Sequence, residues 1–299
     1  MDIGVVFSQA DAGLDAGAMR QWSRDAESAG FHHILAYDHV LGASPERLGP
    51  GPFGAFPAAP YTTANTFQEI LALFSHLAGV TSTIRFVTSV LVLPQRQTAV
   101  AAKQIATVDF LSGGRLDVAV GVGWNAAEYE GLGVDFTQRT GILEEQIQVM
   151  RLLWSEPVVS FHGTYHTLEG VGINPLPTRT MPILIGSGAA TPVLRRVARV
   201  ADGWMPLLIP GLDPVSLRDA VTKLRQICED EGRDPATLSI HGRVYLGDGW
   251  QGRLVEAQEL GCNVCSVGFN RMANPTATHA EHLAQMIEAR SEIVRNLGR

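Results

Sequence analysis

The chain has 299 residues, 45% of them hydrophobic, and its formal net charge at pH 7 is −7. This apolar content suffices for a large core, and a single α/β barrel ordinarily has about this length. The acidic balance and the lack of a basic stripe argue against a nucleic-acid partner, and no apolar run reaches the roughly 20 residues that cross a membrane. We therefore expect a cytoplasmic protein that binds neither nucleic acid nor membrane.

Short apolar runs alternate along the chain with amphipathic helical segments, a pattern typical of repeated βα units. Capping residues such as Asp15 and Thr66 begin intervening helices, and apolar residues between positions 142 and 154 recur at helical spacing. We predict eight strands, at residues 3–7, 33–36, 85–91, 116–121, 183–185, 203–207, 238–243 and 264–269. Eight strands with helices between them predict a (β/α)8 TIM barrel, a single domain over residues 1–299.

Two insertions interrupt the alternation. Residues 42–61 follow the second strand and are so rich in Gly and Pro that we expect a long loop without a helix. Residues 157–180 contain a short turn at Gly163 between two alternating segments, 158–161 and 165–168, which is typical of a β-hairpin. Both insertions are positioned to shape or cover an active site.

Asp38 and His39 directly follow the second strand, at the end of a parallel barrel where ligands bind. A neighbouring carboxylate can orient an imidazole or raise its pKa, although adjacent side chains of an extended chain point to opposite sides. Position alone supports two interpretations about equally. Asp38 and His39 are a catalytic pair, or Asp38 caps a turn and His39 packs under the long loop.

Glycines mark two further strand ends. Gly121 and Gly123 end the fourth strand, and residues 186–189 open a helix after the fifth. Glycine lets a ligand approach the backbone, and the exposed N–H groups of a helix start suit a phosphate, although an ordinary βα turn explains the second segment almost as well. Neither segment matches a P-loop or a dinucleotide fingerprint.

The segments 37–39, 107–129 and 185–188, taken in their order and spacing, resemble the luciferase-like monooxygenase superfamily, and the resemblance extends from Gly4 to about Gly268. It implies an oxidoreductase that transfers a hydride between coenzyme F420 and an organic small-molecule substrate. An FMN-dependent monooxygenase that uses oxygen is the alternative, and a non-catalytic flavin-binding barrel is a third reading. Relatives of this kind are often dimers, so we also expect a homodimer.

The resemblance also implies roles for individual residues. It places His39 beside the central ring carbon of the cofactor and Asp38 against the ring system, and it implies a non-proline cis peptide at Ser89-Val90. The residues implied to bind the cofactor are Ser89, Val90, Gly123, Asn125, Tyr129, Gly186, Ser187, Gly188 and Ala189.

The chain departs from the F420-dependent sugar-phosphate dehydrogenases at one position, because Ala126 stands where they have a catalytic glutamate. Glu128 is two residues further along a helix start and is expected to point elsewhere. The acid or base of the reaction therefore stays open.

Other polar residues carry weaker signals. Arg243 and Tyr245 end the seventh strand and are candidates to meet an anionic part of a substrate. The histidine pairs 162/166 and 279/282 have no further ligands at metal-like spacing, so we predict no metal. Cys262 and Cys265 match C-x-x-C but lead into a strand instead of opening a helix, so we expect no redox role.

Overall fold

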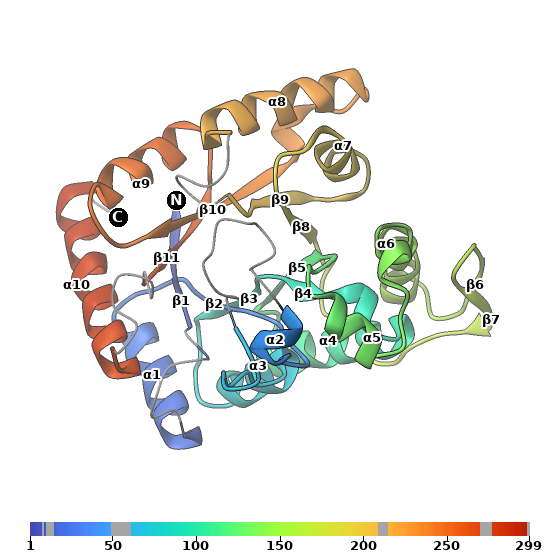
Figure 1. Cartoon of the computed structure of the whole chain (residues 1–299), viewed down its shortest axis with the longest axis horizontal. Coiled ribbons are helices and arrows are strands. Elements are labelled where there is room, and N and C mark those ends of the chain that lie inside the picture. Colours follow the sequence, from blue (N-terminus) through green and yellow to red (C-terminus); the bar gives the residue numbers. More distant parts are fainter. Residues whose placement is uncertain (8, 10–14, 49–60, 209–214, 270–276, 298–299) are drawn as a thin grey trace.

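The computed structural model describes residues 1–7, 9, 15–48, 61–208, 215–269 and 277–297. Parallel strands form one continuous sheet in the order β3-β2-β1-β11-β10-β9-β8-β5-β4, and pairing of β3 with β5 closes it into a barrel with helices outside (Figure 1). The barrel strands are β1 Asp2–Val6, β2 His33–Ala36, β3 Arg85–Thr88, β4 Leu91–Val92, β5 Leu116–Gly121, β8 Ile183–Ser187, β9 Gly203–Pro206, β10 Ser239–Tyr245 and β11 Val264–Gly268. The predicted TIM barrel is confirmed.

The helices follow the strands as the βα alternation predicts. They are α1 Ala16–Ser28, α2 Pro45–Leu48, α3 Ile70–Ala78, α4 Thr98–Ser112, α5 Ala126–Gly131, α6 Arg139–Ser155, α7 Thr191–Val200, α8 Leu217–Asp230, α9 Trp250–Glu259 and α10 His279–Leu297, with 3-10 helices η1 Leu93–Gln95, η2 Phe136–Gln138 and η3 Pro235–Thr237. In α6 the stripe of Leu143, Ile147 and Met150 is buried against the barrel. In the described ranges, no helix is both long and apolar enough to span a bilayer.

The strand predicted at residues 85–91 is divided in two. β3 pairs with β5 as far as Val87 and β4 resumes the pairing at Leu91. Between them the Thr88 hydroxyl takes the place of the backbone ladder, because it donates to the Ala119 carbonyl at 2.7 Å and accepts from the Ala119 N–H at 2.8 Å. The Ser89-Val90 peptide within this break is cis, which confirms the expectation from the resemblance.

The first insertion differs from its prediction over the part described. We expected no helix in residues 42–61, but α2 forms one turn there, with Pro45 at its first position and the Ser44 hydroxyl accepting from the Arg47 N–H at 3.3 Å. A capping serine followed by proline favours a helix start even in a Gly- and Pro-rich segment. Residues 49–60 lie outside the described residues.

The second insertion forms the predicted hairpin, from β6 Val159–His162 and antiparallel β7 Thr167–Val171, which projects from the side of the barrel (Figure 1). Its turn is longer than predicted, because His166 belongs to the turn and holds it to the barrel. The ring contacts Glu145 of α6 through Nδ1 at 2.7 Å and the Thr98 hydroxyl of α4 through Nε2 at 2.6 Å.

The barrel interior is layered. Toward the amino ends of the strands Arg85 pairs with Asp117, and the buried His33 ring, whose residue is in register with Arg85, contacts the Ser266 hydroxyl at 2.7 Å. An apolar layer follows, made of Val6, Leu35, Val87, Ala119, Leu184 and Met205. Since this layer closes the barrel, the space above it at the carboxyl ends is where a ligand has access to inward-facing side chains.

Candidate active site

His39 lies just after β2, at the carboxyl end of the barrel, and faces the carboxylate of Glu128 from α5. His39 Nδ1 and Glu128 Oε2 are 3.4 Å apart, and the His39 side chain retains 18% of its exposure whereas Glu128 retains 2%. Because a carboxylate only accepts hydrogen bonds, the nitrogen that faces it is the protonated one. His39 therefore presents Nε2, with its lone pair, as the atom available to a ligand.

The Glu128 carboxylate is anchored by the chain segment that carries His39. Oε1 accepts from the Val40 and Leu41 N–H groups at 2.8 and 3.1 Å, and Oε2 accepts from the Tyr61 hydroxyl at 2.8 Å. Burial acts to raise the pKa of Glu128, but these hydrogen bonds and the contact with His39 outweigh it and hold the pKa below its ordinary value. Glu128 thus stays ionised and fixes the imidazole.

Sequence reasoning missed Glu128, which was expected to point elsewhere. Asn125 caps α5 by accepting from the Ala127 N–H at 3.0 Å, so Glu128 occupies the third position of the helix. Helical side chains lean toward the amino end, and a glutamate three residues after the cap reaches back over the helix start. The spacing of Asn125 and Glu128 was the available signal.

Aromatic rings enclose His39. The Tyr61 ring lies 3.8 Å from the His39 ring at 30°, and Phe67 and Trp124 meet the imidazole edge to face at 5.0 and 6.3 Å. These rings restrict water around the His39–Glu128 pair and leave part of the imidazole open.

Asp38 points away from His39. Its carboxylate accepts from the Val92 N–H at 2.9 Å and from Arg96 at 2.8 Å, and Arg96 also pairs with Glu69 at 2.8 Å. Burial is the largest influence on Asp38 and raises its pKa in spite of Arg96. The geometry makes Asp38 a residue that ties the start of the His39 segment to β4, with its side chain 1% exposed.

Val90 fills the space that two predicted ligand-contacting glycines leave. A Cβ on Gly121 would lie 2.4 Å from Val90 Cγ2, and one on Gly186 would lie 2.1 Å from Val90 Cγ1. Gly123 has φ 64°, and a Cβ there would lie 2.7 Å from Val92 Cγ1. These three glycines therefore leave room for the side chains of Val90 and Val92. Packing within the protein, and not only the approach of a ligand, requires glycine at these positions.

Asn125 and Tyr129 use their polar groups within the protein. Asn125 Nδ2 donates to the Tyr61 hydroxyl at 2.7 Å, and the Tyr129 hydroxyl donates to the Val122 carbonyl at 2.5 Å. Both residues are buried, and Tyr129 holds the loop after β5 whereas Asn125 supports Tyr61.

The loop before α7 is open to a ligand. Ser187 ends β8 and accepts from Trp204 Nε1 at 3.1 Å, while Gly188 is exposed with no atom within 4 Å of a Cβ position. Lys223 donates to the Ala189 carbonyl at 3.2 Å, which brings an ammonium group to this loop. No side chain caps α7, Pro192 has no N–H, and the Val193 N–H donates to the Ala190 carbonyl at 2.9 Å. The Thr191 N–H, the backbone of the loop and the nearby Lys223 are therefore the groups that suit an anion such as phosphate.

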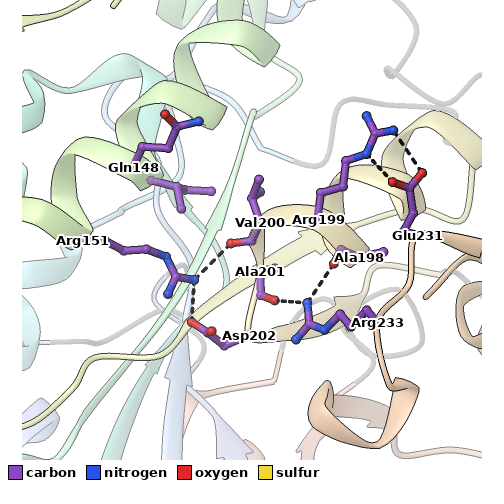
Figure 2. Close-up of a pocket in the computed structure, with 10 residues that line it drawn as sticks. Gln148, Arg151, Ala198, Arg199, Val200, Ala201, Asp202, Glu231 and Arg233 are labelled. Atoms are coloured by element: carbon purple, nitrogen blue, oxygen red, sulfur yellow. Dashed lines mark hydrogen bonds and ion pairs between the residues drawn. The ribbon is translucent and has the colours of Figure 1, made fainter. Parts of the chain in front are cut away.

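A cavity of about 580 Å³ lies at the opposite end of the barrel (Figure 2). Its cations are already engaged, because Arg151 pairs with Asp202 at 2.8 Å, Arg199 pairs with Glu231 at 2.7 Å, and Arg233 donates to the Ala201 carbonyl at 2.6 Å. These contacts serve the carboxyl end of α7, whereas barrel chemistry belongs to the other end.

Among the residues for which a placement is described, no group of three or more His, Cys, Asp or Glu side chains is arranged to hold a metal ion. Cys262 and Cys265 are free and buried, and burial raises the pKa of both thiols, that of Cys262 to about 11. Both thiols are therefore protonated and poorly reactive at neutral pH.

Comparisons with known proteins identify a family and similar structures. A family model described as luciferase-like monooxygenase matches residues 1–296. An uncharacterised protein of Mycobacterium tuberculosis is 32% identical over 235 residues, which are 76% of this chain and 77% of that protein.

Two solved structures have the same fold at low sequence identity. An F420-dependent secondary alcohol dehydrogenase, solved with an F420-acetone adduct, aligns with a TM-score of 0.69 and 17% identity over 90% of this chain and 93% of its own. A monooxygenase from Streptomyces bottropensis aligns with a TM-score of 0.64 and 20% identity over 99% of this chain and 82% of its own.

Proposed function

The chain belongs to the luciferase-like monooxygenase family, whose members are oxidoreductases and monooxygenases, and we propose that it transfers a hydride between coenzyme F420 and an organic substrate. The observation that carries this proposal is the His39–Glu128 pair at the carboxyl end of the barrel, in which Nε2 of a fixed imidazole is left for a ligand. The likeness to an F420-dependent secondary alcohol dehydrogenase supports the choice of cofactor.

A bound deazaflavin ring supplies the carbon that accepts or donates the hydride. When the substrate is oxidised at a carbon that bears a hydroxyl group, the hydroxyl proton must leave as the hydride leaves. His39 Nε2 takes this proton, and the ionised Glu128 stabilises the imidazolium that forms. In the reverse direction the same nitrogen returns the proton to the carbonyl oxygen.

The described residues fit such a cofactor in two places. The loop before α7, with exposed Gly188 and the Lys223 ammonium, would hold a phosphate on the side chain of the cofactor. Tyr61, Phe67 and Trp124 would exclude water from the reacting groups. Asp38 is proposed to act indirectly, because its contacts with Arg96 and Val92 position the His39 segment.

An FMN-dependent monooxygenase is the second candidate, and the likeness to the Streptomyces monooxygenase favours it. Oxygen would then be the second substrate. A barrel that binds a flavin without turnover is a third possibility, which an unchanged rate of cofactor reduction after His39→Ala would favour.

A fluorescence titration of the purified apo-protein with coenzyme F420 and, separately, with FMN tests the proposal. Tight binding of F420 alone supports hydride transfer. Tight binding of FMN alone rejects F420 and makes the monooxygenase the better assignment, and failure to bind either cofactor rejects both.

A further inference from the structure

Side chains from three parts of the barrel converge around the guanidinium of Arg243. Arg243 and Tyr245 come from β10, Tyr37 follows β2, and Ser89 lies between β3 and β4. Arg243 Nη2 donates to the Ser89 hydroxyl at 2.6 Å and Nη1 donates to the Tyr245 hydroxyl at 3.1 Å. The guanidinium carbon lies 5.6 Å from the centre of the Tyr37 ring.

The cluster faces the barrel interior at the carboxyl ends of the strands. Tyr37 and Ser89 each follow an inward-facing residue, Leu35 and Val87, by two positions, and side chains alternate along strands. Arg243 also approaches Met205 of the interior apolar layer, with 3.9 Å between Nη2 and Sδ. The guanidinium therefore lies directly above that layer, on the side open to a ligand.

Within the described part of the chain, Arg243 has no acidic partner, unlike Arg85 and Arg96. Arg85 pairs with Asp117 and Arg96 pairs with Asp38, whereas Arg243 contacts hydroxyl groups, an aromatic ring and a thioether, and its Nε atom has no hydrogen-bond partner. A partly buried cation without a counter-ion is unfavourable for folding, so such a residue points to a charged ligand.

The hydroxyl groups beside Arg243 add hydrogen-bond donors to its positive charge. Burial acts to raise the pKa of Tyr245, but the charge of Arg243 and hydrogen bonds from Tyr37 and Arg243 lower it. Tyr245 is thereby a better hydrogen-bond donor, and its hydroxyl lies 3.4 Å from that of Tyr37, whose pKa burial raises. Hydrogen-bond donors and one positive charge are thus gathered around the Arg243 guanidinium.

We propose that Arg243, Tyr245 and Ser89 form the receptor for a carboxylate group of the substrate. A planar carboxylate matches the two parallel N–H bonds of a guanidinium, and its single negative charge equals the single positive charge of this cluster. A phosphate dianion would need a second cation, which the described residues of the cluster do not provide. The assignment rests on the proposed function in one respect, since it takes the substrate to enter the barrel mouth beside His39.

The test compares acids with their neutral amides. We would measure the midpoint of thermal unfolding at constant ionic strength with acetate or acetamide and with benzoate or benzamide, for the wild type, Arg243→Gln and Arg24→Gln. Arg24 is exposed on α1, so its variant has the same change in charge at a distant place. We expect at least one acid to raise the wild-type midpoint above that of its amide, with affinity at least about 10-fold weaker in Arg243→Gln and unchanged in Arg24→Gln.

Equal midpoints with acid and amide in both wild-type pairs would overturn the proposal without any variant. An acid effect that persists in Arg243→Gln would overturn the proposal as well. If this variant keeps the acid effect but loses affinity for F420 or FMN, Arg243 is assigned to the cofactor ring instead of the substrate. If Arg243→Gln does not fold, Tyr245→Phe keeps the charge and is expected to reduce the acid effect. A wild type that binds carboxylate but neither cofactor rejects the proposed function and leaves the receptor standing.

Discussion

The free energy of unfolding should decrease as the pH falls below 6.5, and replacing His33 with Gln should remove the part of this decrease that is due to His33. His33 is buried in the barrel beside Ser266, and burial, followed by the charge of His241, lowers its pKa from 6.5 to about 3. Below pH 6.5 the unfolded chain binds a proton at this residue and the folded chain does not. The native state is therefore destabilised progressively until the pH reaches about 3.

The size of this effect follows from the shift. Each pH unit between 6.5 and the folded-state pKa costs about 1.4 kcal/mol, so at pH 5 the loss from His33 is about 2 kcal/mol relative to pH 8. His241, whose pKa burial lowers to about 4, contributes a comparable loss that His33→Gln leaves in place.

Urea unfolding at pH 8 and pH 5 measures the effect directly. The free energy of unfolding should fall by about 2 kcal/mol more in the wild type than in His33→Gln over this interval. His162→Gln is the matched control, because its side chain lies on the hairpin with 68% exposure. Equal losses in the wild type and His33→Gln would refute the reasoning, since they would mean that His33 titrates alike in both states.

Three further predictions address the site and the assembly. Under the proposed function, Glu128→Gln should slow turnover by about 10- to 100-fold by releasing His39, while Glu130→Gln, an exposed residue of the same helix, should not; equal rates would remove Glu128 from the mechanism. Gly186→Ala should cost about 1–3 kcal/mol of stability through its clash with Val90, and combined with Val90→Ala it should cost less than the sum of the two changes, as urea unfolding would show; strict additivity would contradict the contact. The homodimer stays a prediction, to which exposed Val100, Phe110 and Leu111 on α4 lend support, and light scattering should give twice the 32.2 kDa chain mass; the mass of one chain would refute it.

Several features of the protein were determined by the sequence alone because they depend on neighbours along the chain. The alternation of apolar runs and amphipathic segments predicted the barrel, since each βα unit is a local pattern. The end of α4 is equally local, because Gly113 follows Ser112 with φ 69°, a backbone conformation that glycine adopts readily. His39 was placed at the barrel mouth for the same reason, as it directly follows a strand.

The partners of these residues were decided only by the tertiary structure. Glu128 meets His39 across 89 positions of sequence, and Arg243 meets Ser89 across 154. Such contacts depend on the order of strands around the barrel and on the rotation of α5, neither of which local spacing specifies. Gly121 and Gly186 make the same point, because the sequence indicated close approach at both positions, and only the closed barrel brings Val90 against them.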